Sequence, residues 1–300
     1  MSGSLLALLS AFCFAASMIC TRRGVLRIKD PALGGYISVF VAPPMFLLAA
    51  MAVSDLPSIT TFTWKGYGLL ALAGIIHFVL GRSSNYWSLK YLGANMTSII
   101  VAVSPVYTIL LGIFILGEHM TGNTALGAAL IVIGPASLFW PEQGGLPKIP
   151  DHSGKPQLSR KGILAALLSG VCYGISPLFI KWGLQQGGSA LAGTFISYAS
   201  ATVVLGSTMI NRVRREEVMN MERRALTWFA LSGFFVGLAQ LFRYIALKLS
   251  PISTAGPLTA TTPLFLLLLS FLVNRNVESF RFTVILGAIL VVIGAVMVYG

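Results

Sequence analysis

The chain alternates between long apolar stretches and short polar ones, and ten of the apolar stretches have the length of a membrane-spanning helix. Such a helix needs about 20 predominantly apolar residues, whereas a strand of a membrane barrel alternates between apolar and polar positions. The run Leu264 to Leu269 does not alternate, so the pattern favours helices. We therefore predict an all-α integral membrane protein with ten transmembrane helices, at residues 3–21, 33–53, 66–88, 94–116, 122–140, 161–181, 190–210, 225–247, 252–273 and 281–299.

The first five predicted helices correspond in sequence to the last five. Ser88-Leu89-Lys90 matches Ala246-Leu247-Lys248 at a spacing of 158 residues. Because each repeat has an odd number of spans, the two copies must enter the membrane in opposite orientations, an arrangement typical of secondary transporters with a site near the bilayer midplane. We predict two inverted five-helix repeats around a central cavity, at residues 1–140 and 161–300, joined by a linker rich in Gly, Pro and Lys at 141–160.

Composition agrees with a membrane protein. Of the 300 residues, 56% are hydrophobic and 10% are charged, while a soluble domain has roughly 25% charged residues. The formal net charge of +12 would suggest nucleic acid binding in a soluble protein, but here the cations lie in short loops and orient the chain in the bilayer. The three cysteines lack the spacing of a metal site, so we expect no metal. We also expect no cofactor and, because the cations lie in short loops, no nucleic acid partner.

Lysines and arginines are concentrated in every second loop. Counted from the N-terminus, the odd loops hold most of them, whereas the even loops hold only Lys65, Lys181 and Lys248. Since positively charged loops remain in the cytoplasm, this distribution predicts cytoplasmic odd loops and both termini outside.

Several motifs recur in both repeats. They are Ser104-Pro105, Leu116-Gly117-Glu118, Leu126-Gly127-Ala128 and Ile133-Gly134 in the first repeat, and Pro263, Glu278, Leu286-Gly287-Ala288 and Ile293-Gly294 in the second. With these motifs, nearly the whole chain resembles the EamA type of the drug/metabolite transporter (DMT) superfamily. The resemblance implies a ten-helix, multi-pass carrier of the plasma or inner membrane that moves a small-molecule substrate by alternating access. It also implies cytoplasmic termini, as in most relatives, which differs from what the charges of this chain predict.

Two arginines lie inside predicted spans, Arg82 in the third and Arg243 in the eighth. Each has an amide three residues away on the same helical face, Asn85 beside Arg82 and Gln240 beside Arg243. Inverted repeats bring these two pairs from opposite sides of the midplane toward one cavity, where they are candidates for substrate binding. The alternative is that each arginine extends toward the lipid headgroups.

The acidic residues are absent from the middle of every predicted span, which argues against a proton-coupled exporter of cationic drugs. Guanidinium groups instead favour a carboxylate, phosphate or sulfonate, which they bind through two hydrogen bonds. We expect a secondary active transporter or exchanger of a small anionic or zwitterionic metabolite, such as an amino acid or organic acid, with a proton or counter-substrate as candidate coupling partner. The alternatives are an exporter of neutral or cationic compounds and a non-transporting receptor. We expect no enzyme, because the sequence has no visible nucleophile–base pair or metal cluster.

Five further residues are candidates for the cavity. Tyr86 and Tyr244 are equivalent in the two repeats, and each follows a candidate polar residue. Ser17 and Ser176 are also equivalent, and either line the cavity or bond back to their own helices. His77 is either a proton relay or a buried histidine with a structural hydrogen bond.

Prolines and glycines mark positions where helices bend or approach each other. Gly127 and Gly134, with their equivalents Gly287 and Gly294, predict close packing of the fifth helix against the tenth. Prolines interrupt several predicted helices, where they mark either moving gates or static kinks. These candidates are Pro43 with its neighbour Pro44, Pro105, Pro177, Pro257 and Pro263.

Overall fold

A computed structural model describes residues 3–117, 121–137, 159–250, 258–259, 261–273 and 282–299. Within these ranges the fold is all-α and contains no strand, as the hydrophobic pattern predicts. Six helical runs are long and apolar enough to cross a membrane, and three shorter apolar helices accompany them. Together these runs include part of each predicted span, and the number of ten crossings stays a prediction. The predicted linker lies outside the described residues except at its last two positions.

The first repeat is a succession of helices that matches its predicted spans closely at most ends. Its elements are α1 (Gly3–Val25), α2 (Ala32–Phe40), α3 (Ala42–Ala52), the 3₁₀-helix η1 (Leu56–Thr60), α4 (Trp64–Gly74), the π-helix η2 (Ile75–Gly81), α5 (Arg82–Val101), α6 (Ser104–Leu116) and α7 (Gly122–Ala136).

The second repeat has longer uninterrupted helices and one element that the apolar pattern did not predict. This element is α10, whose eight residues include five charged ones and therefore carry no apolar run. The elements are α8 (Arg160–Leu184), α9 (Ala190–Thr208), α10 (Arg212–Met219), α11 (Arg223–Leu249), α13 (Thr262–Val273) and α14 (Phe282–Tyr299).

A glycine separates the third predicted span from the fourth. Gly93 has φ 79° and ψ 171°, a conformation that side chains disfavour and glycine tolerates, so the helical direction changes there within α5. Just before this break, the buried Arg22 donates hydrogen bonds to the carbonyl oxygens of Leu89 (2.7 Å) and Lys90 (3.3 Å). These bonds stabilise carbonyls that the end of a helix leaves without intrahelical partners.

The predicted span at 94–116 is divided into two helical segments close to Pro105, one of the prolines expected to interrupt helices. The chain leaves helical geometry after Val101 and resumes it in α6, which begins at Ser104. A proline in the first turn of α6 permits this start, because the missing N–H of Pro105 would have no intrahelical acceptor there.

The candidate gating prolines occupy three kinds of position. Pro43 and Pro105 lie in the first turns of α3 and α6, and Pro263 is the second residue of α13. These three prolines therefore lie at the starts of helices, and the residue before each of these helices is not part of a helix. Pro177 lies inside α8, where it removes one backbone hydrogen bond. Pro257 lies outside the described residues.

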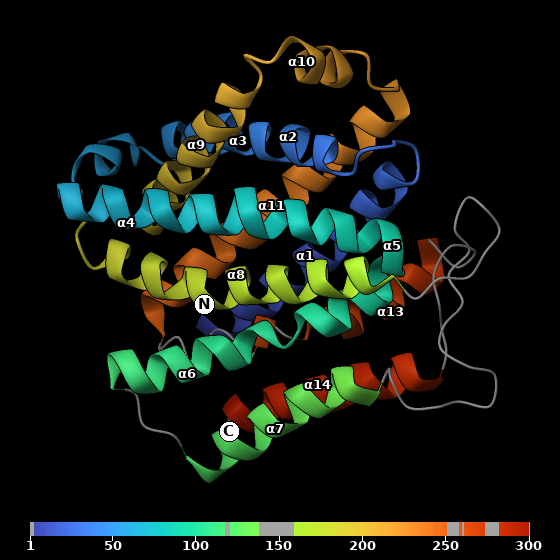
Figure 1. Cartoon of the computed structure of the whole chain (residues 1–300). Helices are drawn as coiled ribbons and strands as arrows, with labels where there is room; N and C mark the ends of the chain where they lie inside the picture. Colours follow the sequence, from blue (N-terminus) through green and yellow to red (C-terminus); the bar gives the residue numbers. More distant parts are fainter. Residues whose placement is uncertain are drawn as a thin grey trace.

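The two repeats run in opposite directions, and α7 and α14 show this directly. A Cβ atom on Gly134 would lie 2.7 Å from the Gly287 carbonyl oxygen, and one on Gly294 would lie 2.5 Å from that of Gly127. The predicted close packing of these equivalent helices is therefore confirmed, and it is antiparallel. Figure 1 shows α7 and α14 side by side along one edge of the molecule.

The remaining helices exchange partners between the repeats. Helix α1 packs along α11, and its equivalent α8 packs along α4 and α5. In the same way α13 packs on α1, and α6 packs on α8. Polar contacts follow the α1–α11 seam, where Ser10 donates to the carbonyl oxygen of Ala239 and Thr21 bonds to Ser232. Because the first helix of each repeat lies in the other half, residues from both repeats meet at the centre (Figure 1).

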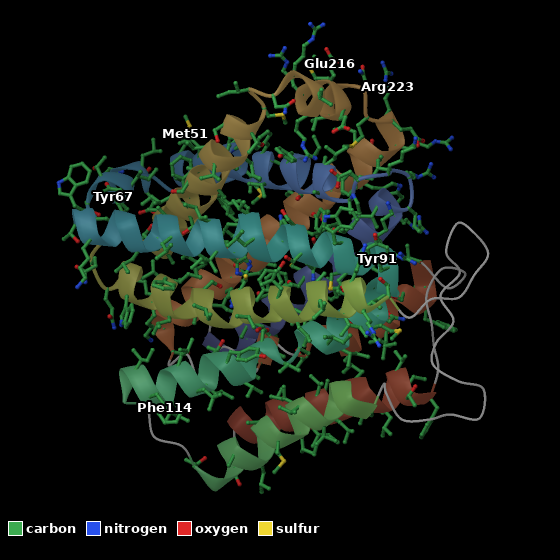
Figure 2. The ribbon with its side chains drawn as sticks, in the orientation of Figure 1. Met51, Tyr67, Tyr91, Phe114, Glu216 and Arg223 are labelled. Atoms are coloured by element: carbon green, nitrogen blue, oxygen red, sulfur yellow. The ribbon has the colours of Figure 1, made fainter. Side chains whose placement is uncertain are left out.

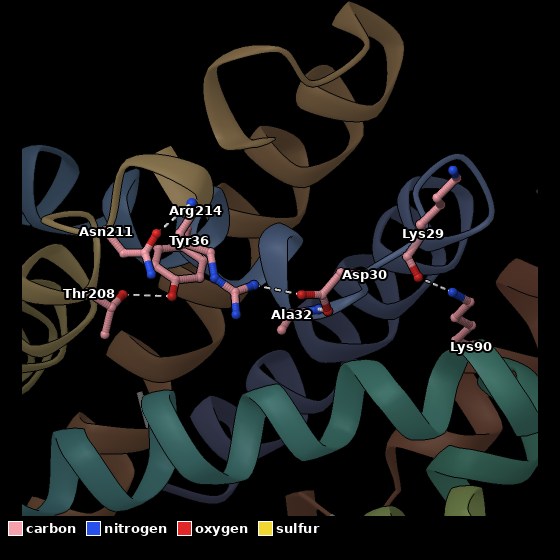
Figure 3. A network of polar contacts seen from close by, with 8 residues as sticks. All are labelled: Lys29, Asp30, Ala32, Tyr36, Lys90, Thr208, Asn211 and Arg214. Atoms are coloured by element: carbon pink, nitrogen blue, oxygen red, sulfur yellow. Dashed lines mark hydrogen bonds and ion pairs between the residues drawn. The ribbon is translucent and has the colours of Figure 1, made fainter. Parts of the chain in front are cut away.

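Helix α10 and the end of α9 are attached to the first repeat by a polar network (Figure 3). Arg214 donates to a carboxylate oxygen of Asp30 at 2.6 Å, and the Tyr36 hydroxyl lies 2.7 Å from that of Thr208. The bond to Asp30 raises the pKa of the Arg214 guanidinium, which stays charged at neutral pH. Both partners are about one-third exposed, so the ion pair contributes at most about 1 kcal/mol. Figure 2 shows Glu216 and Arg223 projecting outward at this end of the molecule.

Candidate functional site

A cavity of about 110 Å³ lies between the two repeats, where α1, α5, α8 and α11 meet. It is smaller than the ~300–1,000 Å³ of sites for drug-sized ligands, so it suits a small metabolite. The lining residues come from both halves of the chain: Phe14, Ser17, Met18, Thr21, His77, Arg82, Asn85, Tyr86, Ser98, Val101, Ala102, Ser104, Tyr173, Val236, Arg243, Thr259, Thr262 and Pro263.

A π-helical turn sets the directions of His77 and Arg82. In a regular α-helix, side chains five residues apart point about 140° away from each other. The π-helix η2 ends at Gly81, and its wider turn pairs each residue with the fifth one along the chain. His77 and Arg82 therefore lie on one side of the helix, and both line the cavity. π-Helical turns occur frequently at functional sites.

Ser38 of α2 anchors the polar side chains of α5. Arg82 Nη1 donates to Ser38 Oγ at 3.2 Å, and the Tyr86 hydroxyl donates to the same oxygen at 2.8 Å. Ser38 Oγ in turn donates to the carbonyl oxygen of Gly35 at 3.1 Å. The guanidinium carbon of Arg82 also lies 5.8 Å and 5.9 Å from the ring centroids of Phe78 and Tyr86. These contacts hold Arg82 inside the bundle rather than near the headgroups.

Arg243 reaches the cavity from α11. Its Nη2 donates to the carbonyl oxygen of Tyr173 at 3.1 Å. Arg243 is 7% exposed and Arg82 is 5% exposed. The ion pairs within the described residues all lie elsewhere, so no carboxylate there neutralises either guanidinium. Two buried cations without a carboxylate partner in the described part of the chain are costly in a membrane protein, and such residues usually mark a ligand or ion site.

His77 connects the cavity to groups behind its wall. Its Nδ1 lies 2.8 Å from Ser176 Oγ, and its Nε2 lies 2.5 Å from Gln240 Nε2. The Tyr173 ring stacks on the imidazole with centroids 4.3 Å apart. Gln240 is fully buried, and its Oε1 has no hydrogen-bond partner within the described part of the chain.

The nine binding candidates from the sequence fall into three groups. Six line the cavity, namely Ser17, His77, Arg82, Asn85, Tyr86 and Arg243. Gln240 and Ser176 lie one layer behind it, each bonded to His77. Tyr244 does not line the cavity, because it packs in the apolar cluster with Ile180 and Leu247.

Sequence reasoning missed several lining residues. Tyr173 is the most important of them, since it contacts both His77 and Arg243. Its repeat equivalent Phe14 also lines the cavity, as do the equivalent residues Ser104 and Thr262. Equivalence between the repeats could have identified these residues, because inverted repeats place equivalent residues near the same centre. An isolated aromatic or hydroxyl residue in an apolar helix carries no such signal.

Curated relatives of this chain are named as transporters. An "Uncharacterized transporter" of Clostridium kluyveri is 22% identical over 84% of this chain and 79% of its own length. Another from Archaeoglobus fulgidus is 20% identical over 98% of this chain and 96% of its own. The "Uncharacterized inner membrane transporter YhbE" of Escherichia coli is 31% identical, over 46% of this chain and 42% of its own length.

The fold is also found among solved structures. One, titled "Crystal structure of protein", superimposes with a TM-score of 0.69 over 98% of this chain and 95% of its own, at 14% identity. At that identity the likeness shows the fold alone. The sequence matches the EamA-like transporter family over residues 1–140 and 160–300, which are the two repeats. The chain is therefore a multi-pass membrane protein that belongs to the EamA-like transporter family.

Proposed function

We propose that this protein is a secondary transporter or exchanger of the inner membrane that moves a small anionic or zwitterionic metabolite by alternating access. The observation that carries the proposal is the pair of buried arginines, Arg82 and Arg243, which face one cavity without a carboxylate partner in the described residues. A carboxylate of the substrate supplies the missing negative charge and accepts paired hydrogen bonds from a guanidinium. An amino acid or organic acid has this chemistry and fits a small cavity.

The cavity also has the chemistry to orient such a substrate. Asn85 offers both a donor and an acceptor, and Ser17 offers a hydroxyl. The apolar side chains of Phe14, Met18 and Val236 line other parts of the wall. A zwitterion with a small side chain therefore finds cationic, polar and apolar surfaces within one site.

A panel of solutes tests the charge preference. We expect succinate or alanine to raise the melting temperature of the purified protein, and tetraethylammonium to leave it unchanged, because a ligand that binds only the folded state stabilises it by about 2.7 kcal/mol at 100 times its Kd. Stabilisation by the cation alone would instead favour export of cationic compounds. A stabilising anion that proteoliposomes fail to take up would indicate a receptor.

We also propose that the end of the molecule carrying α10 faces the cytoplasm, with both termini outside. The support is the excess of Lys and Arg in the odd loops. The exposed positions Arg215 and Lys65 lie in an odd and an even loop, and the three native cysteines are buried. We expect Lys65→Cys to react with a membrane-impermeant maleimide in intact cells and Arg215→Cys to react only after the membrane is opened. The reverse pattern would give this protein the cytoplasmic termini usual among its relatives.

A further inference from the structure

Each ring nitrogen of His77 is hydrogen-bonded to a group that can act both as a donor and as an acceptor. Nδ1 lies 2.8 Å from the Ser176 hydroxyl, and Nε2 lies 2.5 Å from the Gln240 amide. A hydroxyl carries a donor and two acceptor lone pairs, and a primary amide carries a donor end and an acceptor end. A histidine held only for structure also pairs both ring nitrogens, but partners with fixed roles suffice for it, because it keeps one tautomer.

These partners accommodate the imidazole with one proton or with two. In the neutral ring, Nδ1 donates to Ser176 Oγ, which donates to the carbonyl oxygen of Tyr173, while Nε2 accepts from Gln240 Nε2. A second proton on Nε2 needs an acceptor. Rotation of the Gln240 amide about its Cγ–Cδ bond supplies Oε1, which is buried without a partner in the described residues. Neither protonation state therefore leaves a ring nitrogen of His77 unpaired.

Because of the charges around His77, the binding of a second proton to its imidazole depends on what occupies the cavity. Burial is the largest factor that disfavours an imidazolium at His77, and repulsion from the two charged groups that face it, Arg243 on α11 and Arg82 on α5, adds to it. On the other helices packed around η2, the titratable groups that reach it are the phenols of Tyr173 (α8) and Tyr198 (α9) and the thiol of Cys172 (α8). Phenols and thiols are mostly neutral near pH 7. An anion bound between the arginines offsets this repulsion. Occupation by an anion and protonation of His77 therefore favour each other.

We propose that His77 is the proton-binding site that couples transport to the proton gradient. The proposal rests on the proposed anion transport. One proton from water binds the second ring nitrogen of His77 when the anion binds, and both remain bound while the cavity changes sides. The imidazolium then returns its proton to water as the anion leaves. Each cycle moves one anion and one proton in the same direction, and His77 ends neutral as it began.

Linkage between the two ligands supplies the test. Sulfate is a suitable probe because it keeps its charge between about pH 5 and 8, the range in which histidine ordinarily titrates. We expect sulfate affinity for the purified full-length protein, measured by titration calorimetry, to rise by up to about tenfold for each unit that the pH falls through the titration of His77. His77→Gln keeps a hydrogen-bonding side chain but binds no proton, so its sulfate affinity should be the same throughout this range. The double variant His119→Asn/His152→Asn removes the other two histidines of the chain and should keep the pH dependence.

The outcomes separate this inference from the proposed function. Sulfate binding that disappears in Arg243→Gln, but is independent of pH in the unmodified protein, overturns proton coupling and keeps the anion site. A pH dependence that persists in His77→Gln overturns the assignment of the proton to His77. Sulfate binding that is absent, or is unchanged in Arg243→Gln, overturns the anion site and the coupling together.

Discussion

Arg243→Gln should abolish transport while leaving the protein folded. In the structure Arg243 is a buried cation that lines the cavity without a carboxylate partner among the described residues. Removing one member of a buried, hydrogen-bonded charge pair costs about 2–5 kcal/mol, so substrate affinity should fall by at least about 30-fold. Arg82→Gln should have an effect of the same size, since the second guanidinium faces the same cavity. Uptake into proteoliposomes and ligand-induced thermal shifts provide the measurements.

The stability of the substrate-free protein separates a binding role from a structural one. An unneutralised cation inside a membrane protein is unfavourable, so glutamine at position 243 should leave the melting temperature unchanged or raise it. Arg224→Gln is the matched control, because Arg224 lies exposed at the start of the same helix. It should transport like the unmodified protein. Normal transport by Arg243→Gln, or transport lost together with folded protein, would count against the proposed site.

Gly74→Ala should destabilise the whole bundle. A Cβ atom at this position of α4 would lie 2.0 Å from the carbonyl oxygen of Ser197 in α9, so two backbones must separate. Overpacking of this kind costs about 1–3 kcal/mol, and for a chain of this length we expect the melting temperature to fall by about 2–5 °C. The equivalent Gly233→Ala brings a Cβ to 2.7 Å from the carbonyl oxygen of Ser38. Because Ser38 also holds Arg82, this variant should weaken substrate binding as well.

Gly68→Ala is the control for helix composition. Gly68 lies in the same helix as Gly74, and a Cβ there has no neighbour within 4 Å. Alanine is the better helix former and restricts the unfolded chain, so this variant should be as stable as the unmodified protein or slightly more stable. Equal melting temperatures for Gly68→Ala and Gly74→Ala, measured in the same detergent, would show that the α4–α9 contact tolerates expansion.

Local patterns identified most of the helices because each apolar span reports its own length. The apolar pattern missed α10, whose charged residues form no apolar run. It also gave residues 94–116 as one span, although the helix is interrupted after Val101. The break after Val101 comes just before Pro105, one of the prolines that the sequence marks as interruptions, whereas the separate kink at Gly93 is a matter of backbone geometry that hydrophobicity does not encode. The buried arginines were recognisable from the sequence because a charge inside an apolar span is rare whatever surrounds it.

The sequence by itself determined an all-α membrane protein with two inverted repeats, since apolar length and an odd number of spans per repeat leave little alternative. Only the tertiary structure decided which polar residues meet. His77 and Gln240 are 163 positions apart, and their contact depends on how the packed bundle brings a side chain of α11 to one of η2. Tyr244 was an equally good candidate by sequence, yet it packs in an apolar cluster outside the cavity. Repeat symmetry relates positions along the chain, whereas the direction of each side chain depends on local helix register, and the π-helical turn before Arg82 has no counterpart in the unbroken helix α11.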